Sequence, residues 1–423
     1  MRAGGDEGCE GTDGLADRGQ RRLAWARDHM PVLAGVRRRL AREGALKGVR
    51  VGMALHVEAK TGQLALALVE AGAEVRLASC NPLSTDDSVA AALRERHSLP
   101  TFARRGEAPG EYYSNLDSVL EMRPQVVVDD GGDLTTIVHT RRRDLLPGIW
   151  GGCEETTTGV VRLRAMAREG ALAYPVMDVN DALMKHMFDN RYGTGQSTLD
   201  GIMTATNLLL ASRRVVVAGY GWCGRGIAMR ARGMGARVTV TEVDPVRATE
   251  ALMDGMDVAP MAEAIASADL LVTATGCAGV VGADALARAK DGVVLANAGH
   301  FNVEVDIPAL RGMARNEERV REDVVRYTLA DGRRVDLVAE GRLVNLAVGQ
   351  GHPVEIMDLS FALQALSVRH IVANHGKLEP RVHPLPAEFD DEVARAFLEA
   401  GGVRIDSLTE AQRSYLSGWR DGT

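Results

Sequence analysis

The sequence predicts an α/β protein made of two Rossmann-like domains, each a doubly wound parallel sheet, with a small C-terminal extension. Short apolar runs alternate with segments of helical period, as in βαβ units, and this alternation occurs in two successive series. The chain is also long enough for two separate cores, because it has 423 residues of which 46% are hydrophobic.

The first series follows residues 1–17, which lack periodic hydrophobicity and which we expect to form a disordered tail. Apolar residues take a helical spacing from Leu23 onward. Strands are then expected at 49–55 (VRVGMAL), 74–80 (EVRLASC) and 124–130 (PQVVVDD), because each is a short apolar run between helical segments.

The second series has four expected strands, at 213–221, 236–244, 269–276 and 292–300. Each is again a short apolar run, and helical segments separate them. We therefore expect a second sheet of the same kind as the first.

The composition argues against several classes of function. The net charge is −7 and the Arg-rich patches are interleaved with acids, so no nucleic-acid partner is expected. The N-terminus is Gly- and charge-rich, and no long uninterrupted apolar stretch occurs, so no membrane partner is expected. The five cysteines are scattered without CxxC spacing, which predicts no metal site and favours reduced thiols in the cytoplasm.

A glycine motif at the start of the second series predicts a dinucleotide site. Gly219, Gly221 and Gly224 form a GxGxxG after an expected strand, and Glu242 ends the next strand. The first glycine permits the turn, the second lets backbone N–H groups approach a pyrophosphate, and the third lets helix and strand pack closely. Glu242 would bind both ribose hydroxyls and repel a 2′-phosphate, which favours NAD over NADP. A simple Gly-rich turn is the alternative.

Ionisable residues follow the expected strands or link the two series. They occur in DDGGD (129–133), EETTTG (154–159), VNDALMKHMFDNRYGTGQSTLDG (179–201), GHFN (299–302) and VNLAVGQGHP (344–353). Ligands of open α/β sheets bind at the carboxyl ends of the strands, so these motifs are expected to share one site. Each motif alone could instead be a turn, a helix cap or a satisfied histidine.

Together with HVEAKT, SCNPLSTDD, GYGWCGRG, TEVDP and GHPVEIMD, these motifs resemble those of the adenosylhomocysteinase family, from about residue 20 to the C-terminus. The resemblance implies an enzyme that uses NAD as a regenerated catalyst. Oxidation of a nucleoside 3′-hydroxyl makes the C4′ hydrogen acidic, the 5′ substituent leaves by β-elimination, water adds, and the ketone is reduced. A purine nucleoside or its homocysteine thioether would be the partner molecule, and a homotetramer the assembly.

The resemblance also implies roles for the acids and lysine of the site. Lys185 and Asp189 would deprotonate the 3′-hydroxyl, with Lys185 needing a lowered pKa. Glu155 would hold the ribose 2′-hydroxyl. Asp130 would be the base at C4′.

Other implied roles concern protons at C5′ and binding. His56 and His300 would manage proton transfer at the 5′ substituent and water, and His352 would line the purine side of the cleft. The expected contacts to NAD, besides the glycine motif and Glu242, are Thr156, Thr157, Thr158, Asn190 and Asn345. The expected substrate contacts, besides His352, are Glu58, Lys60, Thr61, Met357 and Phe361.

The expected domains follow from the same motifs. A discontinuous substrate-binding domain would comprise 18–185 and 350–376, with the NAD-binding domain at 186–349 between its parts. Residues 377–423 would form a separate C-terminal segment.

The pair Glu58 and Lys60 in HVEAK resembles the pattern of a distinct branch of the family. It bears on which purine base the protein binds. With hypoxanthine, the carboxylate would accept from N1–H and the ammonium would donate to O6. With adenine, the carboxylate would accept from the amino group and the ammonium would donate to N1. The sequence leaves both open, and a plain ion pair at a strand end is a third possibility.

Some positions depart from the family pattern, namely Gly62, Gln63, Thr204, Gln350 and Leu363. They allow an alternative function, a nucleoside-tailoring dehydratase that uses the same cycle with water as leaving group and no homocysteine. A catalytically inactive NAD-binding regulator is a third class, which the complete set of ionisable motif residues argues against.

Overall fold

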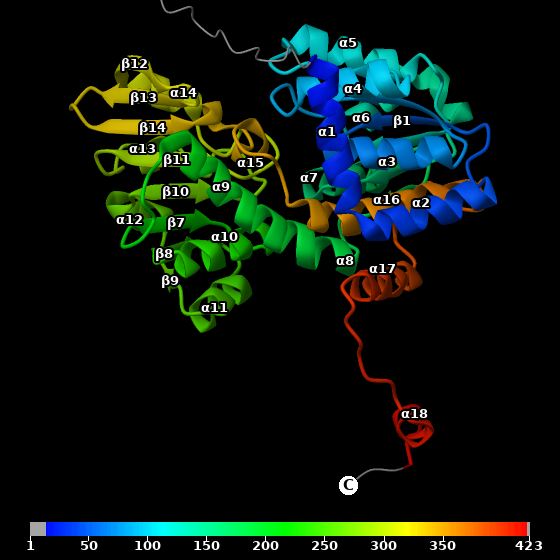
Figure 1. Cartoon of the computed structure of the whole chain (residues 1–423). Helices are drawn as coiled ribbons and strands as arrows, with labels where there is room; N and C mark the ends of the chain where they lie inside the picture. Colours follow the sequence, from blue (N-terminus) through cyan, green and yellow to red (C-terminus); the bar gives the residue numbers. More distant parts are fainter. Residues whose placement is uncertain (1–13, 421–423) are drawn as a thin grey trace, which may run out of the picture.

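The computed structural model describes residues 14–420, which form two α/β units joined side by side (Figure 1). Each unit contains one sheet, here called sheet A and sheet B. In both sheets the third, second, first, fourth and fifth strands in chain order lie in that sequence, as is typical of dinucleotide-binding folds, and sheet A alone continues with its sixth strand. The predicted fold class is therefore confirmed.

Sheet A has seven strands in the order β3-β2-β1-β4-β5-β6-β15, and every neighbouring pair is parallel. Its strands are β1 (Arg50–Ala54), β2 (Glu74–Ala78), β3 (Thr101–Phe102), β4 (Val126–Asp129), β5 (Gly151–Glu154), β6 (Val176–Asp178) and β15 (Val382–Pro384). The strands are buried on both faces, and apolar residues such as Val51, Leu77 and Val127 fill many of their positions.

Helices cover both faces of sheet A. One core contains apolar side chains of α1 (Leu15–Asp28), α2 (Pro31–Glu43), α3 (Ala59–Glu70), α4 (Asp87–His97), α16 (Val354–Ala373) and α17 (Ala387–Ala400). The other contains those of α5 (Pro109–Leu120), α6 (Asp133–Thr140) and α7 (Thr157–Arg168). Helix α16 has the length and composition of a membrane span, but 72% of its apolar window is buried in the first of these cores.

Sheet B has eight strands in the order β12-β13-β14-β11-β10-β7-β8-β9. Its strands are β7 (Arg214–Ala218), β8 (Arg237–Thr241), β9 (Asp257–Val258), β10 (Leu270–Thr273), β11 (Val293–Asn297), β12 (Ala314–Arg321), β13 (Val324–Leu329) and β14 (Arg334–Val338). Six are parallel, whereas the β12–β13 and β13–β14 pairs are antiparallel. The second sheet is thus mixed at one edge, where a fully parallel sheet was expected.

Sheet B is also covered on both faces. One core includes apolar residues of α9 (Thr194–Thr206), α10 (Trp222–Gly233), α11 (Pro245–Met253) and α15 (Val344–Ala347). The other includes those of α12 (Met261–Ala264), α13 (Ala283–Leu286) and α14 (Ile307–Met313).

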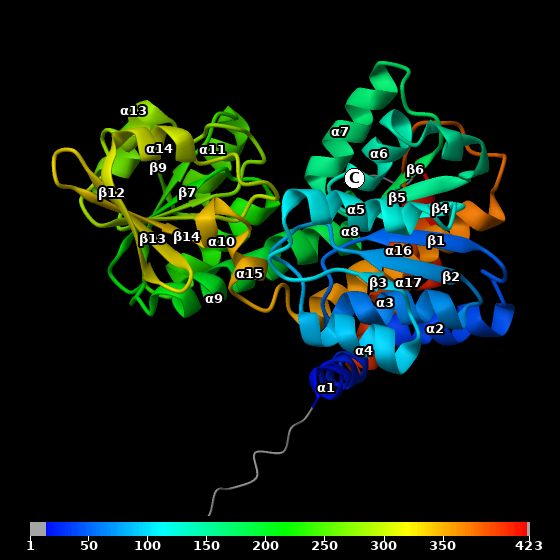
Figure 2. The same ribbon diagram turned by 90° about the horizontal axis from the view of Figure 1, so that it is seen from above.

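The chain passes between the two units twice. It leaves sheet A through α8 (Leu183–Lys185) and the π-helix η2 (His186–Gly193), which continues into α9. It returns through residues 348–353, which connect α15 to α16, and both crossings lie between the units in the view from above (Figure 2). Helix α9, which continues from the first crossing, lies in close contact with α10. A Cβ on Gly195 would lie 2.5 Å from the Gly226 oxygen of α10.

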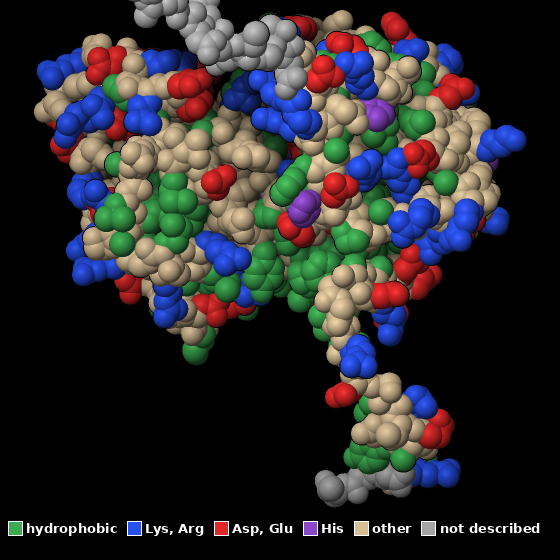
Figure 3. Space-filling view, in the orientation of Figure 1, with side chains coloured by type: hydrophobic (Ala, Val, Ile, Leu, Met, Phe, Trp, Pro, Cys, Tyr) green, Lys and Arg blue, Asp and Glu red, His purple; other side chains and the backbone are tan. Residues whose placement is uncertain are grey.

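The C-terminal part differs from the expectation of a separate segment at 377–423. Strand β15 adds to the edge of sheet A, and α17 packs against α2 and α16, so residues 382–400 complete the first unit. Only the following arm with α18 (Glu410–Ser417) stands clear of the body (Figure 3). At the other end, helix α1 begins at Leu15, while most of the expected tail, residues 1–13, lies outside the described residues.

Helix α1 explains two of the departures from the family pattern. A Cβ on Gly62 would lie 2.5 Å from Cδ2 of Leu23, so a larger residue there would require the Leu23 side chain of α1 to shift. The neighbouring Gln63 donates from Nε2 to the Leu23 oxygen at 2.8 Å. Leu363 is fully buried in the core, whereas Thr204 is exposed.

Candidate active site

Four ionisable side chains emerge from one edge of sheet A. His56 and Cys80 lie two residues beyond β1 and β2, and Asp130 and Glu155 directly follow β4 and β5. Because these strands are parallel, their carboxyl ends meet at the same edge. The topology alone therefore gathers these four residues.

A cavity of about 1230 Å³ lies between this edge and the corresponding edge of sheet B. Every site residue predicted from the sequence lines it except Gly224, which lies behind the glycine turn. The residues come from both units and from both crossings. The cavity is large enough to hold a dinucleotide and a second ligand together.

Lys185 is the centre of a buried charge cluster. Its Nζ lies 2.8 Å from Oδ1 of Asn190, 3.4 Å from Oε1 of Glu155 and 3.5 Å from Oδ2 of Asp189. The π-helical turn of η2 brings Asp189 and Asn190, four and five residues along, back toward the same lysine. Lys185, Glu155 and Asp189 are each at most 5% exposed.

This cluster contradicts the expectation that the pKa of Lys185 is lowered. Burial alone would lower it, but the charges of Asp189, Glu155 and Asp130 more than offset burial and raise the pKa above its usual value. The resting lysine is therefore an ammonium and cannot itself accept a proton.

The carboxyl groups beside Lys185 titrate very differently from each other. Burial would raise the pKa of Asp189, but the charges of Lys185 and His352 hold it well below its usual range. Burial raises the pKa of Glu155 to about 7, and Lys185 offsets this only in part. Glu155 can therefore exchange a proton near neutral pH, whereas Asp189 stays ionised.

Two residues of α16 fix these carboxylates, and the sequence reasoning missed both. Ser360 donates from Oγ to Oδ2 of Asp189 at 2.7 Å, and Gln364 donates from Nε2 to Oε2 of Glu155 at 2.5 Å. They are four residues apart and so face the same side of the helix. The only sequence signal was the presence of polar residues within a strongly apolar helix.

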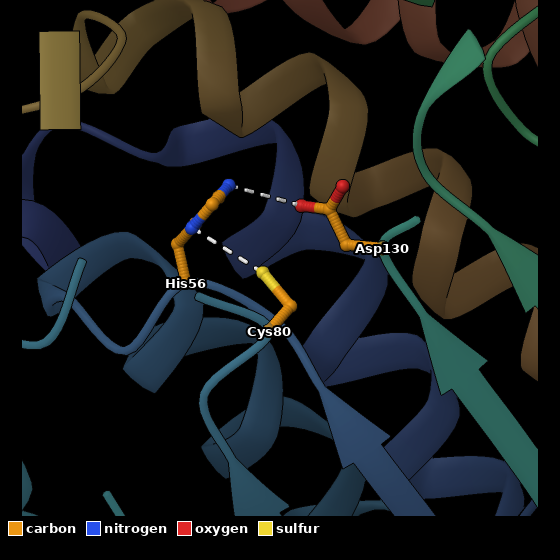
Figure 4. Close-up of side chains that lie close together, drawn as sticks. All are labelled: His56, Cys80 and Asp130. Carbon is orange, nitrogen blue, oxygen red and sulfur yellow. Dashed lines mark hydrogen bonds and ion pairs between the residues drawn. The ribbon is translucent and has the colours of Figure 1, made fainter. Parts of the chain in front are cut away.

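His56 connects Asp130 to Cys80 (Figure 4). Its Nε2 lies 3.4 Å from Oδ2 of Asp130, and its Nδ1 lies 3.3 Å from the sulfur of Cys80 and 2.7 Å from Oγ of Ser84. Burial lowers the pKa of His56 to about 4, although Asp130 acts in the opposite direction. The imidazole is thus neutral at pH 7, with Nε2–H facing the carboxylate in the favourable tautomer.

Within residues 14–420, His56, Cys80 and Asp130 form the only group of three or more His, Cys, Asp or Glu side chains close enough together to hold a metal ion. The sulfur and the carboxylate approach opposite nitrogens of the ring, as Figure 4 shows, rather than one common point. The arrangement therefore suits a chain of proton transfers better than a metal ion. His300, from sheet B, adds a second imidazole 3.6 Å from Oδ1 of Asp130.

The HVEAK pair lies at the N-terminus of α3. Glu58 caps the helix by accepting from the backbone N–H groups of Lys60 at 2.9 Å and Thr61 at 3.2 Å. The ammonium of Lys60 donates to the backbone oxygens of Gln350 and His352, both at 2.9 Å, and lies 3.1 Å from Oε2 of Glu58. Both side chains therefore have protein partners before any ligand is present.

The glycine motif has the geometry predicted for a dinucleotide. Gly219 has φ +94°, which favours glycine, and a Cβ on Gly224 would lie 1.9 Å from the Gly219 oxygen. A Cβ on Gly221 would meet no atom closer than 3.8 Å, so the turn is open toward the cavity. Glu242 lines the cavity at the end of β8, where it accepts from Tyr220 N–H at 2.6 Å.

Polar groups on the opposite wall face the same space. Thr157 and Asn190 both donate to Oδ1 of Asn180, at 3.2 Å and 3.0 Å. Asn345 donates to Ser197, but its buried Oδ1 has no hydrogen-bond partner among the described residues. An unpaired buried carbonyl is costly, so it fits a donor on a bound molecule, such as a carboxamide. The residues present therefore fit a nicotinamide dinucleotide.

Comparison with known proteins agrees with this geometry. A family model described as "S-adenosyl-L-homocysteine hydrolase" matches residues 13–146, and one described as "S-adenosyl-L-homocysteine hydrolase, NAD binding domain" matches residues 190–351. The adenosylhomocysteinase of Thermoplasma acidophilum is 60% identical over 402 residues, covering 95% of this chain and 98% of the relative.

Two further relatives are similar over nearly their whole length. The S-inosyl-L-homocysteine hydrolase of Methanocaldococcus jannaschii is 54% identical, with 96% of this chain and 97% of the relative covered. The adenosylhomocysteinase of Aquifex aeolicus is also 54% identical, with coverages of 97% and 98%. Relatives with either purine in their names are thus more than half identical to this chain.

Proposed function

This chain belongs to the S-adenosyl-L-homocysteine hydrolase family, and we propose how its site carries out the reversible hydrolysis of a purine nucleoside linked through sulfur to homocysteine. It is an NAD-dependent enzyme. The single observation that carries the assignment of roles is the burial of Lys185 among Glu155, Asp189 and Asp130 in a cavity shared with the glycine turn.

The difficulty of the reaction lies in the C4′–H bond, which is too weakly acidic to break while C3′ carries a hydroxyl. The glycine turn and Glu242 would hold NAD, which would supply the reversible oxidation at C3′. The protein must then receive the hydroxyl proton, remove the C4′ proton and protonate the departing sulfur.

We assign the hydroxyl proton to a relay through Lys185. Since Nζ is already protonated, it can accept the 3′-hydroxyl proton only as it passes one of its own to a neighbour. Glu155 lies 3.4 Å away with a pKa of about 7, which makes it the acceptor. Asp189 stays ionised and holds the ammonium in place through this transfer.

We assign the elimination step to Asp130 and its two imidazoles. Asp130 removes the C4′ proton and passes it to His56 or His300, which lie 3.4 Å and 3.6 Å from its two oxygens. The imidazole then protonates the sulfur as the C5′–S bond breaks, so the proton lost at C4′ leaves with homocysteine. Addition of water runs the same path in reverse, and no observation favours the dehydratase alternative.

For the purine, we propose that Glu58 is the polar group that meets the base. Its carboxylate lines the cavity and keeps lone pairs free after capping α3. It would accept from the amino group of adenine or from N1–H of hypoxanthine, so both thioethers are candidate substrates.

We also propose a homotetramer, the assembly that the family resemblance implies. The arm after α17 supports association, because residues 401–420 are all exposed and carry large apolar side chains. These are Val403, Ile405, Leu408, Tyr415, Leu416 and Trp419. A second copy of the chain would bury them.

The experiment that tests the function uses the purified protein with S-adenosylhomocysteine, S-inosylhomocysteine and a thiol-free nucleoside that carries an extra hydroxymethyl group. Release of free homocysteine from either thioether, followed by thiol assay and mass spectrometry, is the expected result. Loss of water from the thiol-free compound with no thiol released from either thioether would overturn the assignment.

A further inference from the structure

The ammonium of Lys60 has no proton left for a purine. A protonated lysine has three N–H donors. Two are directed at the backbone oxygens of Gln350 and His352, both at 2.9 Å, and the third has Oε2 of Glu58 at 3.1 Å. The residue is only 7% exposed, so water screens these contacts little.

The two carbonyl groups belong to the segment 348–353, through which the chain returns from sheet B to sheet A. This segment is tightly folded. Gly351 has φ +71° and donates from N–H to the Asn345 oxygen at 2.8 Å. A Cβ on Gly351 would lie 2.7 Å from Cδ2 of Leu346 and 3.5 Å from Nζ of Lys60, so the segment and the lysine fit closely together.

One of the two carbonyl groups belongs to a residue that acts on the charge cluster. The imidazole of His352 pairs through Nδ1 with Oδ1 of Asp189 at 2.5 Å, and its Nε2 lies 3.2 Å from Oγ1 of Thr194. Lys60 thus holds the backbone of His352 while the side chain of His352 holds Asp189. Asp189 in turn holds the ammonium of Lys185 at 3.5 Å.

We propose that Lys60 is a positioning residue, a fixed cation that ties the return segment 348–353 to α3 and thereby orients His352 against Asp189. It does not read the purine. This proposal rests on the proposed function only for its activity readout, since the tie itself is a property of the protein without substrate.

The consequence for specificity is direct. Loss of the ammonium impairs S-adenosylhomocysteine and S-inosylhomocysteine by the same factor, because the damage reaches the sugar end through His352 and Asp189. A donor that read the base would instead change the ratio of the two activities, since adenine N1 and hypoxanthine O6 lie at different positions of the ring. Purine choice then depends on Glu58 and the backbone around it.

The first test measures hydrogen exchange by mass spectrometry on the full-length protein. Lys60→Met keeps the length of the side chain but removes the charge, and Lys47→Met, at an exposed lysine of the same unit, is the matched control. We expect several-fold faster deuterium uptake in the peptide that covers 346–354 for Lys60→Met and no change for Lys47→Met. Unchanged deuterium uptake in a folded Lys60→Met protein would contradict the proposal that Lys60 holds segment 348–353, whatever the substrate proves to be.

The second test measures kcat/KM for both thioethers. Loss of two hydrogen bonds from a charged donor predicts a decrease of about 10-fold or more for Lys60→Met, with the ratio of the two thioethers unchanged. Ammonium or methylammonium chloride should restore part of the activity to Lys60→Ala, because a small cation can occupy the vacated position, and sodium chloride at equal ionic strength should not. A tenfold change in the ratio would show that Lys60 reads the base. If wild-type protein hydrolysed neither thioether, the proposed function would fail. The hydrogen-exchange result would still show whether Lys60 holds the return segment 348–353.

Discussion

Gln364 of α16 donates a hydrogen bond from Nε2 to Oε2 of Glu155 at 2.5 Å, although 209 residues separate them in sequence. This bond favours the ionised carboxylate and lowers the pKa of Glu155 against the effect of burial. It therefore keeps the proton acceptor of the proposed relay partly ionised near neutral pH.

Gln364→Met should remove this bond while keeping most of the side-chain volume. The pKa of Glu155 then rises, less carboxylate is present at pH 7, and the acidic limb of the kcat profile moves to higher pH, by about one unit. A pH–rate profile checks this, with Gln196→Met at an exposed glutamine as the control. An unchanged acidic limb would mean that Glu155 does not accept the proton.

Two adjacent glutamates give a sharper comparison. Burial raises the pKa of Glu154 well above its usual value, which favours its uncharged form, and its carboxyl group accepts from Gly131 N–H at 2.8 Å. Glu154→Gln preserves shape and hydrogen-bond acceptor and should keep turnover within about threefold, whereas Glu155→Gln should cost about 10²–10⁴ in kcat. Steady-state kinetics on both variants decide, and equal losses would contradict the separation of roles.

The thiol of Cys80 should be unreactive despite its position beside His56. Burial raises its pKa well above the usual value, and the nearby carboxylates, Asp130 foremost, act in the same direction. Brief treatment with iodoacetamide at pH 7.5 should therefore alkylate the exposed Cys277 and leave Cys80 free. Peptide mass spectrometry shows which thiol reacts, and a carbamidomethyl group on Cys80 would refute this reasoning.

The C-terminal arm should contribute to assembly rather than to the fold. Residues 401–420 are all exposed, so removing 403–423 should leave the thermal unfolding of the core almost unchanged while lowering the oligomeric mass. Light scattering coupled to size-exclusion chromatography measures that mass. Replacement of Tyr415, Leu416 and Trp419 by serine should have the same effect without shortening the chain. An oligomer of unchanged mass in both variants would exclude the arm as a contact.

The fold could be predicted from the sequence to the extent that strands were apolar and flanked by helices. All seven expected strands are present, each shorter by two to four residues, because the runs extend into the loops that carry the site. Strands such as β5, which is GGCE, and β12, which is exposed, were missed because they lack an apolar pattern. Strand β15 depends on a contact with β6 that is remote in sequence.

The site could be predicted less completely, and the reason is again distance along the chain. The sequence predicted the motif residues that directly follow strands, because parallel topology alone brings the carboxyl ends of those strands together. The partners that set their chemistry were not found, because Ser360 and Gln364 act across the interface between α16 and the sheet. The raised pKa of Lys185 depends on Asp189, four residues along the chain, and also on Glu155 and Asp130, whose proximity to the lysine no spacing in the sequence reveals.

The proposed mechanism requires reversible cleavage of the C4′–H bond with Asp130 as the base. The most direct measurement is deuterium incorporation at C4′ of the purine nucleoside when the holoenzyme turns over in D₂O, followed by NMR and mass spectrometry. We predict that deuterium accumulates at C4′ over many turnovers with the wild-type protein and is reduced at least a hundredfold with Asp130→Asn. Full hydrolysis of the thioether in D₂O with only protium at C4′ would contradict the mechanism.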